Sequence, residues 1–253
     1  MNDRDSASKI ILDAYFENLP RTSGDERSQA WMVHKVRHTF QVESAMTDIV
    51  SSMPGLSEAD ARKAGVAALL HDLGRFYQTL GDLSFRHGAH ARALLQRIGK
   101  FDDPAILFAI EEHDKHAIDY ANPLYAAMDA EAKKSAGTVA KLLRDADKLG
   151  NMRDFVRHYI PSLLSTRGSG LSTEAREAVE RGGETVDYRL IKTKADEIAG
   201  LASWVVDINF AQTRGFIAEL DYIATCAERM AAAGASPEEC ALVRAAYSRY
   251  ESP

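Results

Sequence analysis

Apolar residues recur at intervals of three and four along almost the whole chain, and the alternating pattern that marks a strand is weak. This periodicity predicts an all-α fold in which each helix buries one face. Glycine, proline and asparagine separate the periodic segments, as Gly55, Gly81 and Gly99 do. The helices predicted in this way cover residues 6–19, 26–52, 87–98, 103–114, 131–149, 192–212, 215–233 and 237–250. One more helix is predicted between its N-cap candidate Ser57 and the pair His71–Asp72.

One segment interrupts this pattern. Residues 165–184 are polar and rich in glycine, and they begin with "STRGSG". Such a composition is typical of an exposed connection between regular elements. We therefore expect either a mobile loop that acts as a lid or a solvated linker.

Composition and charge narrow the classes of protein to consider. The 253 residues are 45% hydrophobic and 27% charged, which is enough for a substantial core. A net charge of −6 without a long basic stripe argues against a stable complex with nucleic acid. A small anionic substrate remains compatible with a local pocket of basic side chains and metal.

The sequence also bears on the cellular compartment of the protein. Cys226 and Cys240 alone cannot form a disulfide framework, which suits a reducing compartment. The stretch "MNDRDSASKI" lacks the order of a signal peptide, and no apolar run approaches the length of a membrane span. We therefore expect a cytoplasmic protein without membrane contact. A homo-oligomer is compatible with the sequence but not indicated by it.

The histidines are unevenly distributed, because all eight lie between His34 and His158. His71 and Asp72 end an apolar run, and both side chains need partners if they are buried. Imidazoles and carboxylates from several helices are the ligands that a divalent ion uses in a helical bundle. The candidates beside predicted apolar helix faces are His38, His71, Asp72, His87, His90, His113, Asp114, Asp145 and Asp147.

Four of these residues, in their order and local context, resemble the HD-domain superfamily of metal-dependent phosphohydrolases. The resemblance rests on His38 in "KVRHTFQVESA", on His71 and Asp72 in "LLHDLGRF", and on Asp147 in "RDADKLGN". The later stretch "SWVVDINFAQT" also looks like part of a bacterial group of HD-domain proteins. The resemblance implies a single HD-type helical domain over residues 1–253. Its core would cover about residues 26–160, and a C-terminal helical extension at about 185–253 would pack on it.

The resemblance also implies a metal centre. One divalent ion would bind His38, His71, Asp72 and Asp147. A second would bind His87 and His113, which resemble two histidines of an extended branch of the superfamily, and the Asp72 carboxylate would bridge the two ions. Such a pair would acidify water into hydroxide and hold the attacking and leaving oxygens at phosphorus. The ligand types do not distinguish Mn, Fe, Mg, Ni, Co and Zn.

Several of these residues have more than one interpretation. If the site held one metal, His87 and His113 would instead support the ligands or contact the substrate. His90 lies three residues from His87 on the same side of the helix, so it is an alternative ligand or a supporting residue. Asp114 takes a position where some two-metal members have His or Glu, which makes it a weak ligand, a supporting residue or a helix cap.

Three basic residues closely follow candidate ligands: Arg75, Lys115 and Lys148. Each could reach a substrate phosphate by a charge-assisted hydrogen bond. The alternative for each is a solvated surface charge, which is the commoner fate of lysine and arginine.

These observations predict a metal-dependent hydrolase that cleaves a phosphate ester or phosphoanhydride of a nucleotide or another small phosphorylated metabolite. Metal-activated hydroxide would be the nucleophile. The same ligand set also resembles HD-type mixed-valent diiron oxygenases. A non-catalytic sensor that binds a nucleotide is a third hypothesis, but the loss of metal residues expected of it is not seen in the sequence.

Overall fold

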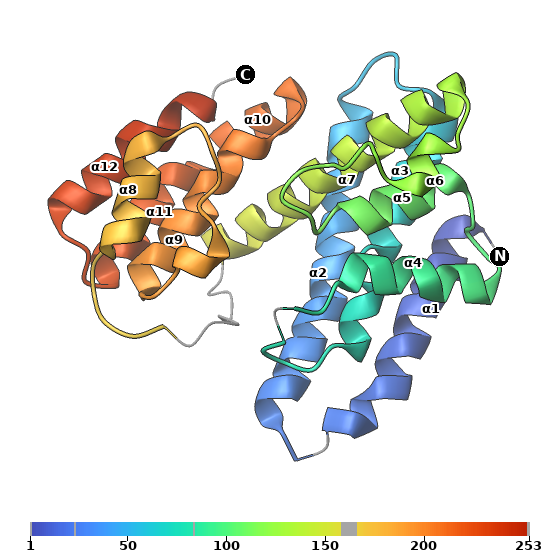
Figure 1. The fold of residues 1–253 in the computed structure, drawn as a ribbon, viewed down its shortest axis with the longest axis horizontal. Helices are drawn as coiled ribbons and strands as arrows, with labels where there is room; N and C mark the ends of the chain where they lie inside the picture. The colour runs from blue at the N-terminus through green and yellow to red at the C-terminus, as the bar shows by residue number, and fades with distance from the viewer. Residues whose placement is uncertain (1, 23, 83, 158–165, 252–253) are drawn as a thin grey trace. The chain divides into compact units, whose positions relative to one another are not determined.

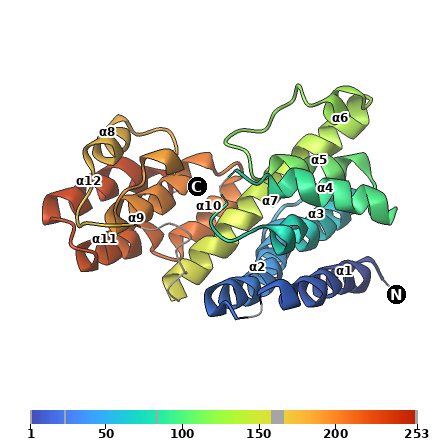
Figure 2. The same ribbon diagram turned by 60° about the horizontal axis from the view of Figure 1, so that its bottom comes forward.

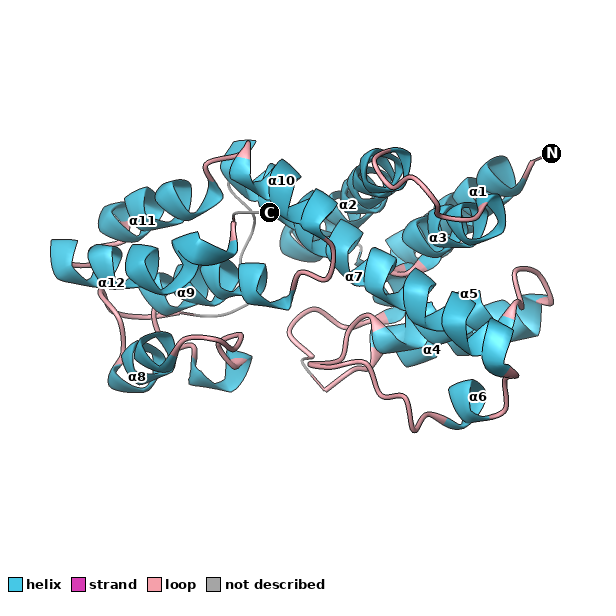
Figure 3. Ribbon diagram, turned by 90° about the horizontal axis from the view of Figure 1, so that it is seen from above, coloured by secondary structure: helices cyan, strands magenta, loops and turns pink. Residues whose placement is uncertain are grey.

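The computed structural model describes residues 2–22, 24–82, 84–157 and 166–251, and every regular element among them is a helix (Figures 1 and 3). The predicted all-α class is therefore confirmed. The chain divides into two compact units, residues 1–151 and 152–253, and the boundary falls inside one long helix. Packing of the C-terminal extension on the core stays a prediction. No helix of the described residues combines the length and apolar character that crossing a membrane requires.

The N-terminal unit is built around one central helix, the third in the following list of the unit's helices. Its helices are α1 Asp3–Asn18, α2 Glu26–Ser51, α3 Glu58–Leu70, α4 His87–Ile98, α5 Pro104–Glu112, α6 Pro123–Ala126 and most of α7 Ala130–Arg157, with the 3₁₀ turns η1 Leu19–Thr22 and η2 Leu73–Tyr77. α3 packs against α1, α2 and α5, while α4 packs against α5 and η2 (Figure 2). The last turns of α3 are apolar and buried on all sides, so this helix ends inside the unit.

Local sequence signals fix the ends of the central helices. Ser57 caps α3 by accepting the Asp60 N–H at 3.0 Å. Asp103 caps α5 in the same manner, and Pro104 follows in the first turn. Gly99 ends α4 in the left-handed conformation at φ 66°. These signals determine which residues follow or begin each helix.

Three candidate ligands lie at these helix ends. His71 directly follows α3, His113 directly follows α5, and His87 is the first residue of α4. α4 and α5 pack on each other, and the ends that carry His87 and His113 meet, since the Nε2 atoms of these two residues are 3.0 Å apart.

The C-terminal unit contains the remaining helices. They are α8 Thr173–Arg181, α9 Lys194–Ser203, α10 Ala211–Ala218, α11 Tyr222–Ala232 and α12 Pro237–Tyr247, with the 3₁₀ turns η3 Tyr188–Leu190, η4 Trp204–Asp207 and η5 Ser248–Tyr250. α9 packs against α8, α11 and α12. Capping boxes at Thr193 and Ser236 start α9 and α12. The large buried residues Tyr222 and Tyr247 belong to this unit's own core.

The prediction of a loop or linker over residues 165–184 is wrong for its central part, where α8 lies. Ser172 caps this helix, and Ala175 and Val179 are buried one turn apart. Two apolar positions are too few to produce a periodic signal, and packing against α9 and α12 supplies the stability instead. Ser165 lies outside the described residues.

Two predicted C-terminal helices have different boundaries in the structure. The helix predicted over 192–212 ends at Ser203, and Ile208 is extended before α10 begins. β-Branched residues together with Asp207 and Asn209 lower helix propensity there. The helix predicted over 215–233 is interrupted by Asp221, whose φ of 50° separates α10 from α11.

Candidate metal centre

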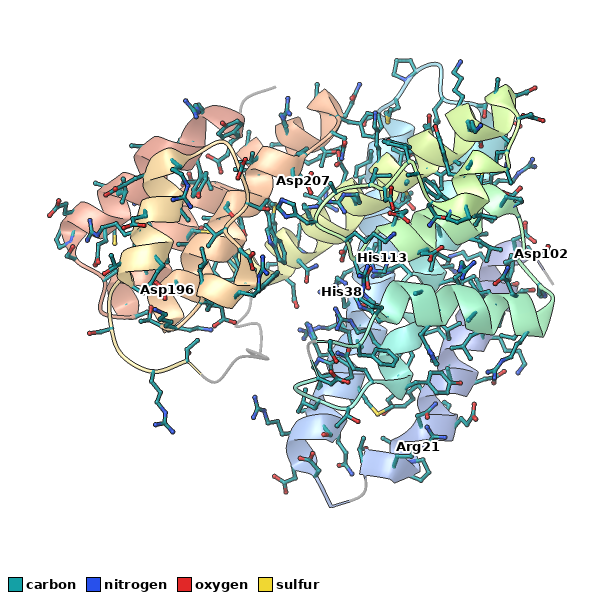
Figure 4. All side chains as sticks on the ribbon, viewed as in Figure 1. Arg21, His38, Asp102, His113, Asp196 and Asp207 are labelled. Carbon is teal, nitrogen blue, oxygen red and sulfur yellow. The ribbon has the colours of Figure 1, made fainter. Side chains whose placement is uncertain are left out.

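Six predicted ligands converge in the N-terminal unit. Their ligand atoms form overlapping groups of three in which all atoms lie within 4.8 Å of one another. These groups are His38, His71 and Asp72; His71, His113 and Asp147; and Asp72, His87 and His113. Figure 4 labels His38 on α2 and His113 after α5, which lie near each other in this unit.

Asp72 lies at the centre of this cluster. Its backbone, at φ −94° and ψ 10°, is in the bridge region between α3 and η2, where functional residues are often found. Oδ1 lies 3.3 Å from His87 Nε2 and 3.9 Å from His113 Nε2. Oδ2 lies 3.5 Å from His71 Nε2 and 3.7 Å from His38 Nε2. The two carboxylate oxygens therefore face two different pairs of histidines.

Asp147 of α7 completes the half of the cluster formed by His38 and His71. Its Oδ1 lies 3.0 Å from His38 Nε2 and 3.8 Å from His71 Nε2. Asn151, one turn later, donates from Nδ2 to the same oxygen at 3.0 Å. Although burial raises it, the adjacent His38 ring holds the pKa of Asp147 far below its usual value. This carboxylate is therefore ionised at neutral pH.

The hydrogen bonds of three rings turn one nitrogen of each ring toward the cluster. His71 Nδ1 lies 2.8 Å from the Ala68 carbonyl, and His113 Nδ1 lies 2.6 Å from the Ile110 carbonyl. A carbonyl only accepts, so each Nδ1 carries the proton, and Nε2 presents a lone pair whenever the ring is neutral. His87 Nδ1 lies 3.1 Å from an Asp114 oxygen and is protonated for the same reason.

The Nε2 atoms of His87 and His113 crowd against each other. They are 3.0 Å apart, and an oxygen of Asp72 is close to both. Buried lone pairs packed this closely are unfavourable unless a cation lies among them. The donor set, imidazole nitrogens and carboxylate oxygens, is the one that divalent transition metals bind. The residues therefore fit a divalent metal ion.

Burial and neighbouring charges set the protonation of the other ligands. Burial lowers the pKa of His38, and the nearby Lys35 charge lowers it further. Burial also lowers the pKa of His71, but the Asp72 and Asp147 carboxylates raise it by more. Burial alone would raise the pKa of Asp72, yet Lys35 and His71 hold it well below its usual value.

We expect the metal-free protein to lose stability as the pH falls between about 6 and 4, because burial lowers the pKa of His87 from 6.5 to about 3. In this window the unfolded chain binds the proton and the folded chain does not, so protonation favours unfolding. This one residue should reduce the free energy of unfolding by up to about 1.4 kcal/mol per pH unit. Urea unfolding at several pH values should give a shallower pH dependence for His87→Gln than for the wild type. Equal slopes would contradict this assignment.

Arg144, which is not among the predicted ligands, holds the backbone around His113 in place. Arg144 of α7 is 4% exposed, and its guanidinium donates to the carbonyls of His113 at 3.3 Å and His116 at 3.0 Å. It also donates to the Lys115 carbonyl at 2.5 Å. A planar guanidinium is suited to several carbonyls at once. Hydrogen bonds from one guanidinium to several backbone carbonyls leave no local sequence signal, so sequence reasoning did not find this role of Arg144.

Two glycines allow the close approach of the segments around His87. A Cβ on Gly74 would lie 2.2 Å from the His87 carbonyl oxygen. A Cβ on Gly88 would lie 2.5 Å from the Ile110 carbonyl oxygen. Both distances are shorter than any normal contact, so only glycine fits at either position. These residues set how closely η2 and α5 approach α4.

The structure separates the alternative candidates. The ring of His90 packs against Tyr77 and Phe85, at centroid distances of 5.3 and 5.2 Å, away from the ligand groups. Asp114 lies behind His87, where its Oδ2 accepts the Gly88 N–H at 3.1 Å. Asp114 therefore orients a candidate ligand.

The three basic candidates differ in position. Arg75 lies at the cluster, with Nε 3.5 Å from Asp72 Oδ1. Lys115 instead pairs with the fully buried Glu112 at 2.6 Å. Lys148 is half-buried on α7, next in the chain to Asp147. His158 lies outside the described residues.

The fold and the cluster together define a class: a helical protein with a candidate centre for divalent metal ions. Residues 36–152 match the family model of the HD domain. The chain therefore carries an HD domain, and the family predicted from the motifs is confirmed. This domain implies a superfamily of metal-dependent hydrolases. No curated protein and no solved structure matched the chain.

Proposed function

We propose that this protein is a metal-dependent phosphohydrolase that cleaves a phosphate ester or phosphoanhydride of a nucleotide or another small phosphorylated metabolite. The observation that supports this most directly is the position of Asp72, whose two oxygens face the His38–His71 pair and the His87–His113 pair. A carboxylate in that position suits two divalent ions. Membership of the HD domain in a superfamily of metal-dependent hydrolases supports hydrolysis as the reaction.

The ligands are arranged to stay fixed during a reaction. Divalent ions, when bound, lower the pKa of water and polarise phosphoryl oxygens, which is the chemistry that hydrolysis at phosphorus needs. The carbonyls of Ala68 and Ile110 keep the His71 and His113 rings turned toward the cluster. Asp114 does the same for His87. Such preorganisation removes the need for the ligands to rearrange as charge develops.

Arg75 is the basic residue best placed to bind the phosphoryl group. Its side chain is 20% exposed and lies beside Asp72, so the guanidinium is close to both the cluster and solvent. Nη1 donates to Gln78 at 2.7 Å, which steadies the side chain, while Nε makes no hydrogen bond. A planar guanidinium can donate two parallel hydrogen bonds to phosphate oxygens.

Hydrolysis of a panel of substrates, with all products separated by chromatography, tests the proposal. The panel contains nucleoside mono-, di- and triphosphates, pyrophosphate and model diesters, each with protein stripped by a chelator and then supplied with Mn²⁺ or Fe²⁺. We expect hydrolysis of at least one class of substrate, only when metal is restored. A protein that binds metal at the cluster yet hydrolyses none of them would contradict the proposal. Oxygen-dependent loss of a substrate with two irons bound would favour the oxygenase instead.

A further inference from the structure

Lys35 of α2 is a buried cation inside the candidate metal centre. It lies one turn before His38, is 9% exposed, and immediately precedes the residues that match the HD domain. Its Nζ donates to Asp72 Oδ2 at 2.8 Å. That oxygen is the one that faces His38 and His71. An ammonium group therefore lies against an atom that the first metal ion would need.

The two halves of the centre, one formed by His38 and His71 and the other by His87 and His113, differ in the positive charge beside them. Asp72 Oδ1 faces His87 and His113, and the cation beside it is Arg75, whose Nε lies 3.5 Å away. Arg75 is more exposed than Lys35 and is also bonded to Gln78. The half formed by His38 and His71 thus carries the closer and more deeply buried positive charge.

We propose that Lys35 is a counter-ion of Asp72 with two effects, a proposal that rests on the proposed function. In the metal-free protein Lys35 stabilises the buried Asp72 carboxylate. When a divalent ion binds at the His38–His71 half of the centre, the positive charge of Lys35 weakens that binding. Two like charges within a few ångströms in a buried site repel strongly, and a divalent ion feels twice the repulsion of a monovalent one. In the metal-free protein the same ammonium offsets the charge of Asp72, which would otherwise be costly to bury.

Lysine-to-methionine variants test this, because methionine has a similar length and no charge. Mn²⁺ binding is measured by titration calorimetry on the full chain, with Lys35→Met, Lys35→Arg and the wild type. We expect Lys35→Met to bind one Mn²⁺ at least tenfold more tightly, which corresponds to about 1.4 kcal/mol. Lys35→Arg keeps the charge and should remain close to the wild type. Lys63→Met is the matched control, since it removes another lysine–aspartate pair, with Asp103 at 3.0 Å.

The direction in which Lys35→Met changes the Mn²⁺ affinity distinguishes a repulsive counter-ion from a residue that only supports the structure. If Lys35 only supported Asp72, its loss would leave the carboxylate misplaced and Mn²⁺ binding would weaken. Equal or weaker binding by Lys35→Met therefore overturns the proposal while the metal centre stands. A wild type that binds no Mn²⁺ overturns the proposed function as well.

Thermal melting gives a second readout if Lys35→Met is poorly folded without metal. The metal-free variant should melt below the wild type, because Asp72 has lost its partner. Saturating Mn²⁺ should raise the melting temperature of Lys35→Met by more than it raises that of the wild type, since an ion that binds more tightly stabilises the folded protein more. A smaller rise than in the wild type contradicts the proposal.

Discussion

Asp72→Asn is expected to weaken the binding of both metal ions, and with it phosphate release, by at least about 100-fold. Asparagine keeps the shape of the side chain but removes the negative charge shared by the two pairs of histidines. It also leaves the buried ammonium of Lys35, 2.8 Å away, without an anion. Breaking a buried ion pair by removing one partner costs about 3–5 kcal/mol, so the metal-free variant should be less stable too. Metal content by elemental analysis and phosphate release measure the two effects.

Asp114→Asn is the control for this variant. The Asp114 side chain supports the centre from behind through His87 Nδ1, at 3.1 Å, so its loss should reduce affinity by about tenfold. An Asp72→Asn protein that binds as many ions as the wild type, with equal affinity, would show that Asp72 is not a ligand.

Gly74→Ala is expected to lower kcat/KM by about 100-fold although residue 74 touches no metal. The added Cβ would meet the His87 carbonyl oxygen at 2.2 Å, and backbone atoms cannot rotate away as a side chain can. The segment must therefore shift, and a displacement of about 1 Å at a catalytic group can cost this much. Overpacking should also cost about 1–3 kcal/mol of stability. Steady-state kinetics and thermal melting check the two expectations.

Gly65→Ala provides the comparison. Gly65 lies within α3, in the same unit, and a Cβ there would meet nothing within 4 Å. Alanine is the better helix former, so this variant should be as stable as the wild type or more stable by up to about 1 kcal/mol, with unchanged activity. Similar behaviour of the two alanine variants would contradict the steric argument at Gly74.

Helical periodicity and short motifs made much of the N-terminal unit predictable. The segments that became α2, α4 and α5 carry several apolar positions on one face, and strong caps such as Ser57 and Asp103 mark helix starts. The candidate ligands could be proposed from the sequence because His38, His71–Asp72 and Asp147 stand in recognisable contexts. Each prediction depended on residues close together in the sequence.

The features that escaped prediction depend on long-range packing. α8 has only two buried apolar residues and is stabilised by neighbouring helices. Helical spacing alone left His87 and His90 as alternatives, and the preference for His87 came from the resemblance to the family. Lys35 reads as an ordinary surface lysine until the fold places it against Asp72, 37 residues later in the chain.

Anomalous X-ray scattering from crystals grown with Mn²⁺ tests the metal centre most directly. We expect two peaks on opposite sides of Asp72, one next to His38, His71 and Asp147 and the other next to His87 and His113. A single peak would contradict the two-ion arrangement. No peak at this cluster, in a crystal that holds manganese elsewhere, would contradict the assignment of these residues as metal ligands.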